Sequence, residues 1–435
     1  MNCTNNHVIV QFMITDAIYQ HRIERDRNLA APTVPRELLR GARAEMSSPL
    51  IKVITGPRRA GKSVFAFQLL AGQNFAYINL DDERLVGQRD FDEIMKALVT
   101  VYGPVTSLLF DEIQNFPSWE LVVNRLHRQG YAIVVTGSNA HLLSRELGTH
   151  LTGRHVEFRI LPFSFREYCL ARGETARQGM PDPEAVMLHR FGQYLETGGY
   201  PEVVIGGVQA KSYLATLFES VLFKDVVKRY RVKYPRKLHE LALYLTSNHS
   251  SEYTFNAIRG ALGFRSVHTV ENYTAYLAES YLFFSVERYS PKLKELFKAP
   301  RKAYSIDLGL IDAVKFKSLP DRGRLLENLV ALELLRRGNR FYSYKSAGSR
   351  ECDFVVREGN TTAELIQVAY ETPSPKTFKR ELTGLAAAAR DLSCDRLTCL
   401  TWNETWERRI DRWKVKAQPV WRWLMESRDT GPPEA

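Results

Sequence analysis

The chain has 435 residues, of which 44% are hydrophobic and 25% charged, and its formal net charge is +11. Its length suffices for two or three domains, and no apolar run approaches the roughly 18–20 residues of a membrane span. The five cysteines are odd in number and form no CxxC pair, which disfavours a disulfide framework or a zinc site and favours a reducing cytoplasm. The positive charge permits an anionic partner such as nucleic acid.

The stretch VITGPRRAGKS, residues 53–63, matches the phosphate-binding pattern G-x-x-x-x-G-K-[ST]. A strand leads into it and a helix leaves it, so the loop N–H groups and the helix N-terminus would face one anion. Lys62 would reach the β- and γ-phosphates, and Ser63 would hold Mg²⁺ through its hydroxyl. A chance match is the alternative, and the flanking elements argue against it. The predicted nucleotide-binding residues are Gly56, Pro57, Arg58, Arg59, Ala60, Gly61, Lys62, Ser63 and Val64.

A second signal is the apolar stretch 107–111, which ends in Asp111 and is followed by Glu112. An Asp at the end of a buried strand can orient hydrated Mg²⁺ together with Ser63. Glu112 can act as a general base on the attacking water, while Lys62 stabilises the transferred charge. The alternative is an ordinary helix N-terminus, where acidic residues favour the helix dipole.

Polar residues follow a third buried stretch at 131–136. The predicted sensors of the γ-phosphate are Thr136, Ser138 and Asn139. Arg145 and Arg154 come next, and either is a candidate for a catalytic arginine that completes the site of a neighbouring subunit, in a homo-oligomer. Ordinary surface salt bridges explain these arginines equally well.

Strands expected at 51–55, 76–80, 107–111 and 131–136 alternate with helical stretches. This alternation predicts an α/β fold with a parallel sheet, crossover helices on both faces, and ligands at the carboxyl ends of the strands. A further strand separates the phosphate loop from the acidic strand in sequence, and a Glu directly follows the Mg²⁺ Asp. Both features indicate ATP hydrolysis rather than kinase chemistry.

Together these motifs resemble the prokaryotic AAA-type P-loop ATPases that carry a winged-helix middle region and a C-terminal domain with a restriction-endonuclease-like, PD-(D/E)xK fold. The matching stretches include TGPRRAGKS, LFDEIQNFPSWE, TGSNAHLLSREL, YLETGGYPEVV, YSIDLGL, LENLVALELLRRG and ECDFVV. The resemblance covers about residues 33–425 and implies that Lys62, Ser63, Asp111 and Glu112 are nucleotide and catalytic positions.

We divide the chain accordingly into six parts. They are a flexible or helical arm (1–32), a P-loop ATPase domain (33–170), a helical linker region (171–235), a winged-helix domain (236–318), a restriction-endonuclease-like domain (319–425) and a disordered tail (426–435).

Residues 253–290 have the layout of a helix-turn-helix followed by strands, with the turn at Gly263 and the second helix from about Ser266. In a DNA reader the second helix enters the major groove and a basic wing contacts phosphates, so we expect double-stranded DNA as a partner. The predicted DNA contacts are Arg265, His268, Asn272, Lys292, Lys294, Arg301 and Lys302. The alternative is a regulatory lid of the ATPase whose lysines form a solvated face.

The C-terminal elements follow the αβββαβ order of the nuclease core, with Glu327, Asp353 and Gln367 at its metal positions. In such enzymes carboxylates hold Mg²⁺, and a lysine two residues after the third position assists the same water. That position is Ala369, which cannot replace a cation, and Glu364 points to the other face of its strand. We therefore predict a degenerate nuclease site without activity.

Two alternatives bear on this degenerate site. Lys345 or Lys376 could reach in from a neighbouring element and restore the missing cation. Asp353 could equally be a buried acid tied to backbone amides.

The sequence thus predicts an ATP hydrolase with ATP and Mg²⁺ as cofactors, whose nucleotide cycle moves a DNA-binding and nuclease-like module. One alternative is an ATP-switched signalling protein that binds a protein partner. Another is an ATP-gated DNA endonuclease. We expect a cytoplasmic protein that does not engage a membrane.

Overall fold

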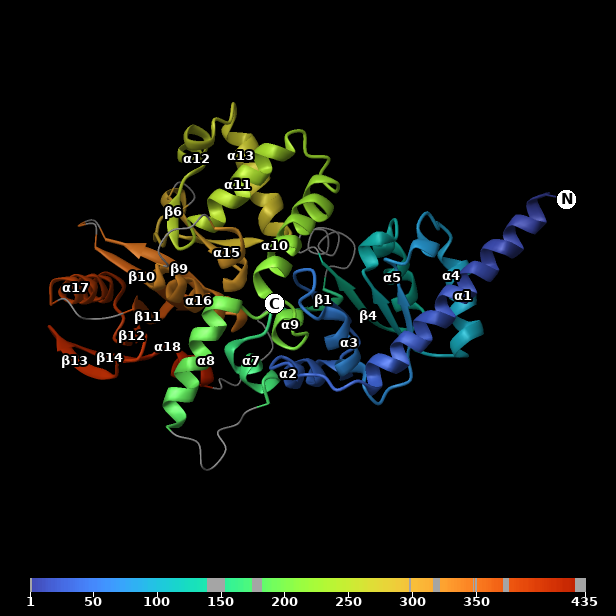
Figure 1. The fold of residues 1–435 in the computed structure, drawn as a ribbon, viewed down its shortest axis with the longest axis horizontal. Helices are drawn as coiled ribbons and strands as arrows, with labels where there is room; N and C mark the ends of the chain where they lie inside the picture. The colour runs from blue at the N-terminus through green and yellow to red at the C-terminus, as the bar shows by residue number, and fades with distance from the viewer. Residues whose placement is uncertain are drawn as a thin grey trace. The chain divides into compact units, whose positions relative to one another are not determined.

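The structure is a computed structural model that describes residues 2–138, 153–173, 182–296, 299–315, 321–346, 348, 350–370 and 375–426. It divides into two compact units, the first ending at Leu161 and the second beginning at Pro162. Each unit has its own sheets and core and is described by itself (Figure 1). Within the described residues, no helix combines the length and the apolar character needed to cross a membrane.

A five-stranded parallel sheet forms the first unit, with the strand order β2-β3-β4-β1-β5. The strands are β1 (Ile51–Thr55), β2 (Ala76–Asn79), β3 (Ser107–Asp111), β4 (Ala132–Gly137) and β5 (His155–Arg159). The sequence predicted the first four but not the edge strand β5. Because β4 pairs with both β1 and β3, its carboxyl end lies between the phosphate loop and the acidic residues. This sheet fits a P-loop NTPase core.

Helices cover both faces of this sheet. One hydrophobic cluster joins the sheet to α1, α4 and α5, and a second joins it to α2 and α3. The helical elements are α1 (Asn2–Ala30), α2 (Leu39–Ala44), η1 (Glu45–Ser47), α3 (Lys62–Leu70), η2 (Glu83–Leu85), α4 (Phe91–Tyr102), η3 (Ile113–Asn115) and α5 (Trp119–Arg128). The residues Ile14, Ala17 and Ile18 of α1 are buried in the first cluster, so this part of the expected arm belongs to the core.

Helix α4 shows how local sequence sets an element of this unit. Asp90 caps it by accepting a hydrogen bond from the backbone N–H of Asp92 at 2.9 Å. Ile94 and Leu98 repeat at the spacing of one helical face and are buried. Gly103, at φ 75°, allows the chain to leave the helix. The cap, the apolar face and the glycine together fix where α4 begins, packs and ends.

The second unit begins with helices and continues into a three-stranded antiparallel sheet of order β6-β8-β7. The helical elements are α7 (Phe165–Ala171), α8 (Pro183–Thr197), α9 (Pro201–Val204), α10 (Ala210–Ser220), the π-helical η4 (Val221–Val227), α11 (Pro235–Ser247), α12 (Phe255–Leu262), α13 (Val267–Glu279), α14 (Leu293–Leu296) and α15 (Leu308–Val314). The strands are β6 (Ser251–Tyr253), β7 (Phe283–Glu287) and β8 (Arg301–Ser305). Gly263, at φ 64°, makes the turn between α12 and α13.

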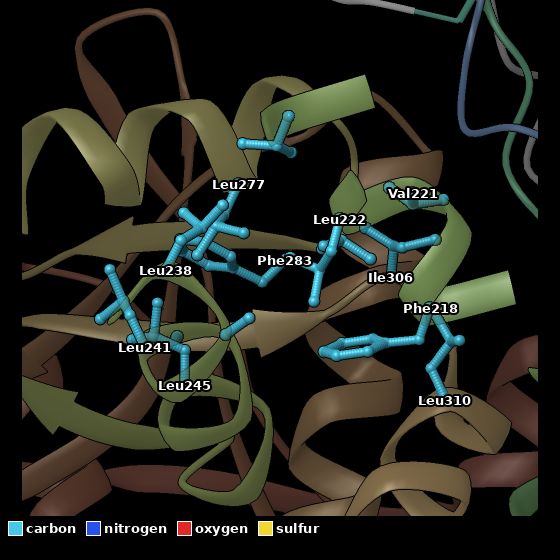
Figure 2. Packing of buried hydrophobic residues seen from close by; sticks show 14 of the residues in the cluster. Phe218, Val221, Leu222, Leu238, Leu241, Leu245, Leu277, Phe283, Ile306 and Leu310 are labelled. Carbon is cyan, nitrogen blue, oxygen red and sulfur yellow. The ribbon is translucent and has the colours of Figure 1, made fainter. Parts of the chain in front are cut away.

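The segment expected as a linker shares its core with this sheet. Phe218 of α10 and Leu222 of η4 belong to the same buried cluster as Leu277 of α13, Phe283 of β7 and Leu310 of α15 (Figure 2). The helices before α11 therefore pack as part of the module that follows them.

A six-stranded mixed sheet of order β13-β14-β12-β11-β10-β9 completes the second unit. Its strands are β9 (Arg340–Lys345), β10 (Glu351–Glu358), β11 (Thr361–Ala369), β12 (Leu397–Thr401), β13 (Trp406–Ile410) and β14 (Trp413–Pro419). Its helices are α16 (Arg322–Arg336), α17 (Pro375–Leu392) and α18 (Val420–Met425). The pairing of β10 with β9 shifts register between Cys352 and Val355, and this irregularity contains Asp353.

Candidate nucleotide site

The phosphate-binding loop runs from β1 to α3 through backbone conformations that restrict its residues. Gly56 has φ 143° and Gly61 has φ 90°, and Arg59 also lies in the left-handed region at φ 66°. A Cβ at Gly56 would stand 1.9 Å from the carbonyl oxygen of Ile160. Glycine is therefore required at position 56 both by its torsion and by the close approach of the chain after β5.

Lys62 connects the loop to the acidic residues after β3. It is the first residue of α3, and its side chain is buried. The Nζ donates a hydrogen bond to the carbonyl oxygen of Pro57 at 3.1 Å and lies 3.6 Å from Oε1 of Glu112. The ammonium therefore lies where a phosphate cradled by the loop would meet the predicted base.

Asp111 ends β3 and is held by two hydroxyl groups. Its Oδ1 accepts a hydrogen bond from Thr136, and its Oδ2 accepts one from the hydroxyl of Tyr77 at 3.3 Å. Burial and the neighbouring Glu112 raise the pKa of Asp111, while hydrogen bonds from Thr136 and Ser63 oppose this shift. The carboxylate is thus fixed in direction, with the Ser63 hydroxyl close by.

Glu112 has a left-handed backbone at φ 51°, which is unusual for a residue other than glycine. Such strain is stored at functional sites when surrounding contacts hold it in place. Its backbone N–H donates to Oγ1 of Thr136 at 3.0 Å, and its carboxylate accepts a hydrogen bond from Gln114. Burial alone would raise the pKa of Glu112, but Lys62, Gln114 and other neighbours hold it below the ordinary value. Glu112 is therefore ionised at neutral pH, as a general base must be.

The remaining predicted loop and sensor residues fall as follows. Arg58 and Ser138 both lie close enough to Glu112 to lower its pKa. Val64 is exposed on the first turn of α3, and Ala60 is buried. Asn139 lies outside the described residues.

Of the two predicted arginines, the structure describes Arg154, which does not join this site within the chain. Arg145 lies outside the described residues. Arg154 precedes β5, where its carbonyl accepts a hydrogen bond from the N–H of Ile51 at the amino end of β1. Its guanidinium donates to Oδ1 of Asn124 at 2.6 Å. Arg154 therefore lies away from the nucleotide site of its own chain, because the phosphate loop is at the opposite end of β1. Its role in the site of a neighbouring subunit stays a prediction.

Arg36 is a site residue that the sequence did not reveal. Its buried guanidinium donates to the carbonyl oxygen of Ala60 in the loop, at 2.9 Å, and to that of Leu161. It therefore ties the phosphate loop to the chain that follows β5. No motif surrounds it, and only the fold brings it to the loop.

Helix α1 also contributes to the site, which the sequence did not predict. His21 lies 2.9 Å from Oδ2 of Asp82, just after β2, and Tyr77 of β2 contacts Asp111. Glu24 has a raised pKa because of burial and the charge of Asp111. Helix α1 thus packs next to the acidic residues of the site, Asp82 and Asp111.

The three predicted nuclease positions meet in the second unit. Asp353 accepts hydrogen bonds from Nε2 of Gln367 and from the N–H of Val368, which matches the alternative of a buried acid tied to a backbone amide. Glu327 and Asp353 both contact Lys302 of β8.

The other residues weighed for the nuclease site lie elsewhere. Lys345 pairs with Glu351 at 2.5 Å, and Glu364 accepts a hydrogen bond from Thr398. The side chain of Lys376 lies outside the described residues.

The predicted DNA contacts differ in their exposure and in the ion pairs that they form within the chain. Arg265, His268, Lys292 and Lys294 are exposed, and Asn272 is half-buried. Lys292 pairs with Glu295 at 3.1 Å, and Arg301 lies 3.7 Å from Glu287. Lys302 is only 8% exposed and faces two carboxylates, so its expected role as a phosphate contact is corrected.

Comparison with known proteins places these sites in context. Residues 48–169 match the family described as AAA domain, and residues 188–320 and 322–417 match two domains of unknown function, DUF8612 and DUF4143. An uncharacterized protein of Methanocaldococcus jannaschii is 31% identical over 398 residues, covering 86% of this chain and 88% of that protein.

Two further similarities extend the comparison. An uncharacterized protein of Haemophilus influenzae is 32% identical over 342 residues, covering 74% of this chain and 83% of that protein. A Walker-type ATPase of Pyrococcus abyssi superposes with a TM-score of 0.45 at 15% identity, covering 65% of this chain and 96% of the other.

Proposed function

We propose that this chain, which belongs to the same family as the Methanocaldococcus jannaschii protein and carries an AAA-type P-loop domain, hydrolyses ATP to ADP and phosphate. We further propose that it couples this reaction to the binding of duplex DNA. The observation that carries the ATPase proposal is the meeting of Lys62, Asp111 and Glu112 at the carboxyl ends of β1 and β3. The expectation of an AAA-type domain is confirmed.

Each residue of this group has a distinct role in the reaction. Glu112 accepts a proton from the water that attacks the γ-phosphorus, and the bond to the bridging oxygen of ADP breaks. Lys62 stabilises the negative charge that develops on the transferred group. The Thr136 hydroxyl orients the Asp111 carboxylate and the backbone of Glu112 relative to each other.

The residues present fit a Mg²⁺ ion. Ser63 and Asp111 offer a hydroxyl and a carboxylate oxygen close together, and oxygen atoms are the ligands that Mg²⁺ prefers. When bound there with ATP, the ion would neutralise charge on the β- and γ-phosphates.

Steady-state phosphate release from ATP tests the reaction, with Glu112→Gln and Lys62→Ala as the comparison. Glu112→Gln should still bind ATP but hydrolyse it about 10²–10⁴-fold more slowly, because it lacks the base. Lys62→Ala should lose both binding and turnover. Hydrolysis by Glu112→Gln at the wild-type rate would show that another group activates the water.

The DNA proposal rests on the module from α11 to β8. The order α11, β6, α12, α13, β7, β8 and the strand order β6-β8-β7 support a winged-helix arrangement. Arg265 and His268 are exposed just before and on the first turn of α13, and Asn272 is half-buried on its second turn. Lys294 is exposed between β7 and β8. Glu271 also lies there and weakens the positive field. We therefore propose contact mainly with the phosphate backbone rather than readout of base sequence.

The ATPase rate with and without duplex DNA tests this coupling. Stimulation that fades with added salt supports backbone contact, because binding releases condensed counterions. Arg265→Ala and Lys294→Ala should each weaken DNA binding, whereas Lys211→Ala, at an exposed lysine of α10, should not. A rate indifferent to DNA would instead favour a protein partner and a switch role for ATP.

A further inference from the structure

A buried ionic cluster joins the two sheets of the second unit. We call it the Lys302 cluster, and it consists of Lys302 and Tyr304 of β8, Glu327 of α16, Asp353 of β10 and Gln367 of β11. The Nζ of Lys302 lies 2.8 Å from Oε1 of Glu327 and 3.5 Å from Oδ1 of Asp353. The hydroxyl of Tyr304 donates to the same Glu327 oxygen at 2.7 Å.

The register shift in β10 places Asp353 in this cluster. Its Oδ2 accepts hydrogen bonds from Nε2 of Gln367 at 2.8 Å and from the N–H of Val368 at 2.9 Å. Its own N–H donates to Oε1 of Gln367 at 3.3 Å. Asp353 thus binds β11 through Oδ2, while its Oδ1 faces Lys302. The two hydrogen bonds with Gln367 hold the Asp353 side chain in this orientation.

The nuclease resemblance implies Mg²⁺ at Glu327, Asp353 and Gln367, but the residues present do not fit this ion. A ligand oxygen would have to approach Mg²⁺ to about 2.1 Å, and the Glu327 oxygen already faces an ammonium. Burial would lower the pKa of Lys302, but Glu327 and Asp353 outweigh it and raise the pKa, so the ammonium keeps its charge. In the described part of the chain, no group of three or more His, Cys, Asp or Glu side chains is arranged to hold a metal.

We propose that the Lys302 ammonium is the resident cation of the Glu327 and Asp353 pair, where it excludes a divalent metal and joins the β6-β8-β7 sheet to the six-stranded sheet. The side chain that fills the missing cation position thus comes from another module, not from β11, where Ala369 stands. The site is a structural joint and does not cleave phosphodiester bonds. This inference is independent of ATP hydrolysis.

A second contact next to the cluster supports the joint. The side chain of Asn328, the residue after Glu327, donates to the carbonyl oxygen of Ser305 in β8 at 2.8 Å and accepts from its N–H at 2.8 Å. Asn328 is fully buried. Strand β8 is therefore fixed to α16 by an ion pair and an amide pair that involve the adjacent residues Glu327 and Asn328, and α16 in turn packs against β11 of the six-stranded sheet.

Binding of Mn²⁺ to the full chain, measured by the EPR signal of the free ion without nucleotide, tests the proposal. Lys302→Met should bind one additional Mn²⁺ per chain compared with wild type, because it uncovers two carboxylates. The matched double variant Lys302→Met/Glu327→Gln should lose that additional ion. If Lys302→Met binds no more Mn²⁺ than wild type, or if Asp353→Asn removes a Mn²⁺ from otherwise wild-type protein, the proposal is wrong.

Stability measurements cover the case in which Lys302→Met folds poorly. The single variant leaves two buried acids uncompensated, so its Tm should drop, and Mn²⁺ should raise that Tm while leaving the wild-type value unchanged. Lys302→Met/Glu327→Gln/Asp353→Asn removes all charges of the cluster and should recover most of the lost Tm. A single variant as stable as wild type would contradict the joint.

Cleavage of plasmid DNA is the remaining arm of the test. The wild-type chain with Mg²⁺ or Mn²⁺ should cut no faster than Asp353→Asn. Cleavage that Asp353→Asn abolishes would overturn the proposal and establish the ATP-gated endonuclease instead.

Discussion

Thr136 of β4 donates a hydrogen bond to Asp111, and the same hydroxyl accepts one from the backbone N–H of the next residue, Glu112, at 3.0 Å. A single hydroxyl therefore fixes the direction of the predicted Mg²⁺ ligand and the strained backbone of the predicted base. This contact exists because β4 lies between β1 and β3 in the sheet. It makes Thr136 a positioning residue in addition to its predicted role as a sensor.

Thr136→Val keeps the shape of this side chain but removes both hydrogen bonds. We expect kcat for ATP hydrolysis to fall about 10–100-fold, as is typical when a group that orients a ligand is lost. Thr136→Ser retains the hydroxyl and should keep most of the activity. Steady-state kinetics with both variants measure this, and equal activity of the two would show that the hydroxyl does not position the acidic residues.

Gly56→Ala should disable the nucleotide site through the backbone. The new Cβ would meet the carbonyl oxygen of Ile160 at 1.9 Å, and φ 143° is strained for any residue with a side chain. We expect ATP affinity to fall at least about 10-fold, equivalent to about 1.4 kcal/mol. Gly192→Ala, on α8 with open space around it, is the matched control and should leave affinity unchanged. Wild-type affinity in Gly56→Ala would mean that the loop relaxes freely.

The phosphate loop could be predicted from sequence because its determinants are local. Gly56, Lys62 and the preceding strand lie within one short stretch, and the spacing alone specifies the backbone. Lys302 could not be placed in this way, because its partners Glu327 and Asp353 lie 25 and 51 residues further along the chain. The charge of Lys302 and the lysines near it in sequence indicated an exposed wing. Only the pairing of β8 in its sheet shows that the Lys302 side chain points toward the buried carboxylates.

Arg36 was missed for the same reason, and it supplies a third prediction. Its guanidinium bridges the carbonyl oxygens of Ala60 and Leu161, so Arg36→Met leaves a carbonyl of the phosphate loop without its donor. We expect KM for ATP to rise about 10-fold with a smaller change in kcat. A phosphate loop that is less ordered in the free protein loses conformational entropy when ATP binds, and this weakens the binding.

Arg36→Lys keeps the charge but lacks the planar fork that spans two carbonyls, so it should rescue only partly. The exposed Arg40 of α2 provides the control Arg40→Met, which should behave as wild type. Titration of ATP in the steady state separates KM from kcat. A fall in kcat at unchanged KM would place Arg36 in the chemical step instead of in loop positioning.

His249, in the turn after α11, should make the second unit sensitive to acid. It is buried, and burial first, then the charges of Arg324 and Lys315, lower its pKa to about 4, against the opposing Thr246 carbonyl and Asp321. Between about pH 6.5 and 4 the unfolded chain binds a proton at this residue and the folded chain does not. The contribution of His249 to the free energy of unfolding is therefore fully present above about pH 6.5, and about 3 kcal/mol of it is lost as the pH drops to 4.

His249→Gln removes this titration, so its stability should depend less steeply on pH than that of wild type across the same window. Urea denaturation followed at several pH values between 4 and 7 measures the two slopes. His268→Gln, at an exposed histidine of α13, provides the matched substitution control. Parallel pH profiles for wild type and His249→Gln would mean that His249 becomes protonated within the folded chain, with Nε2 reached by water.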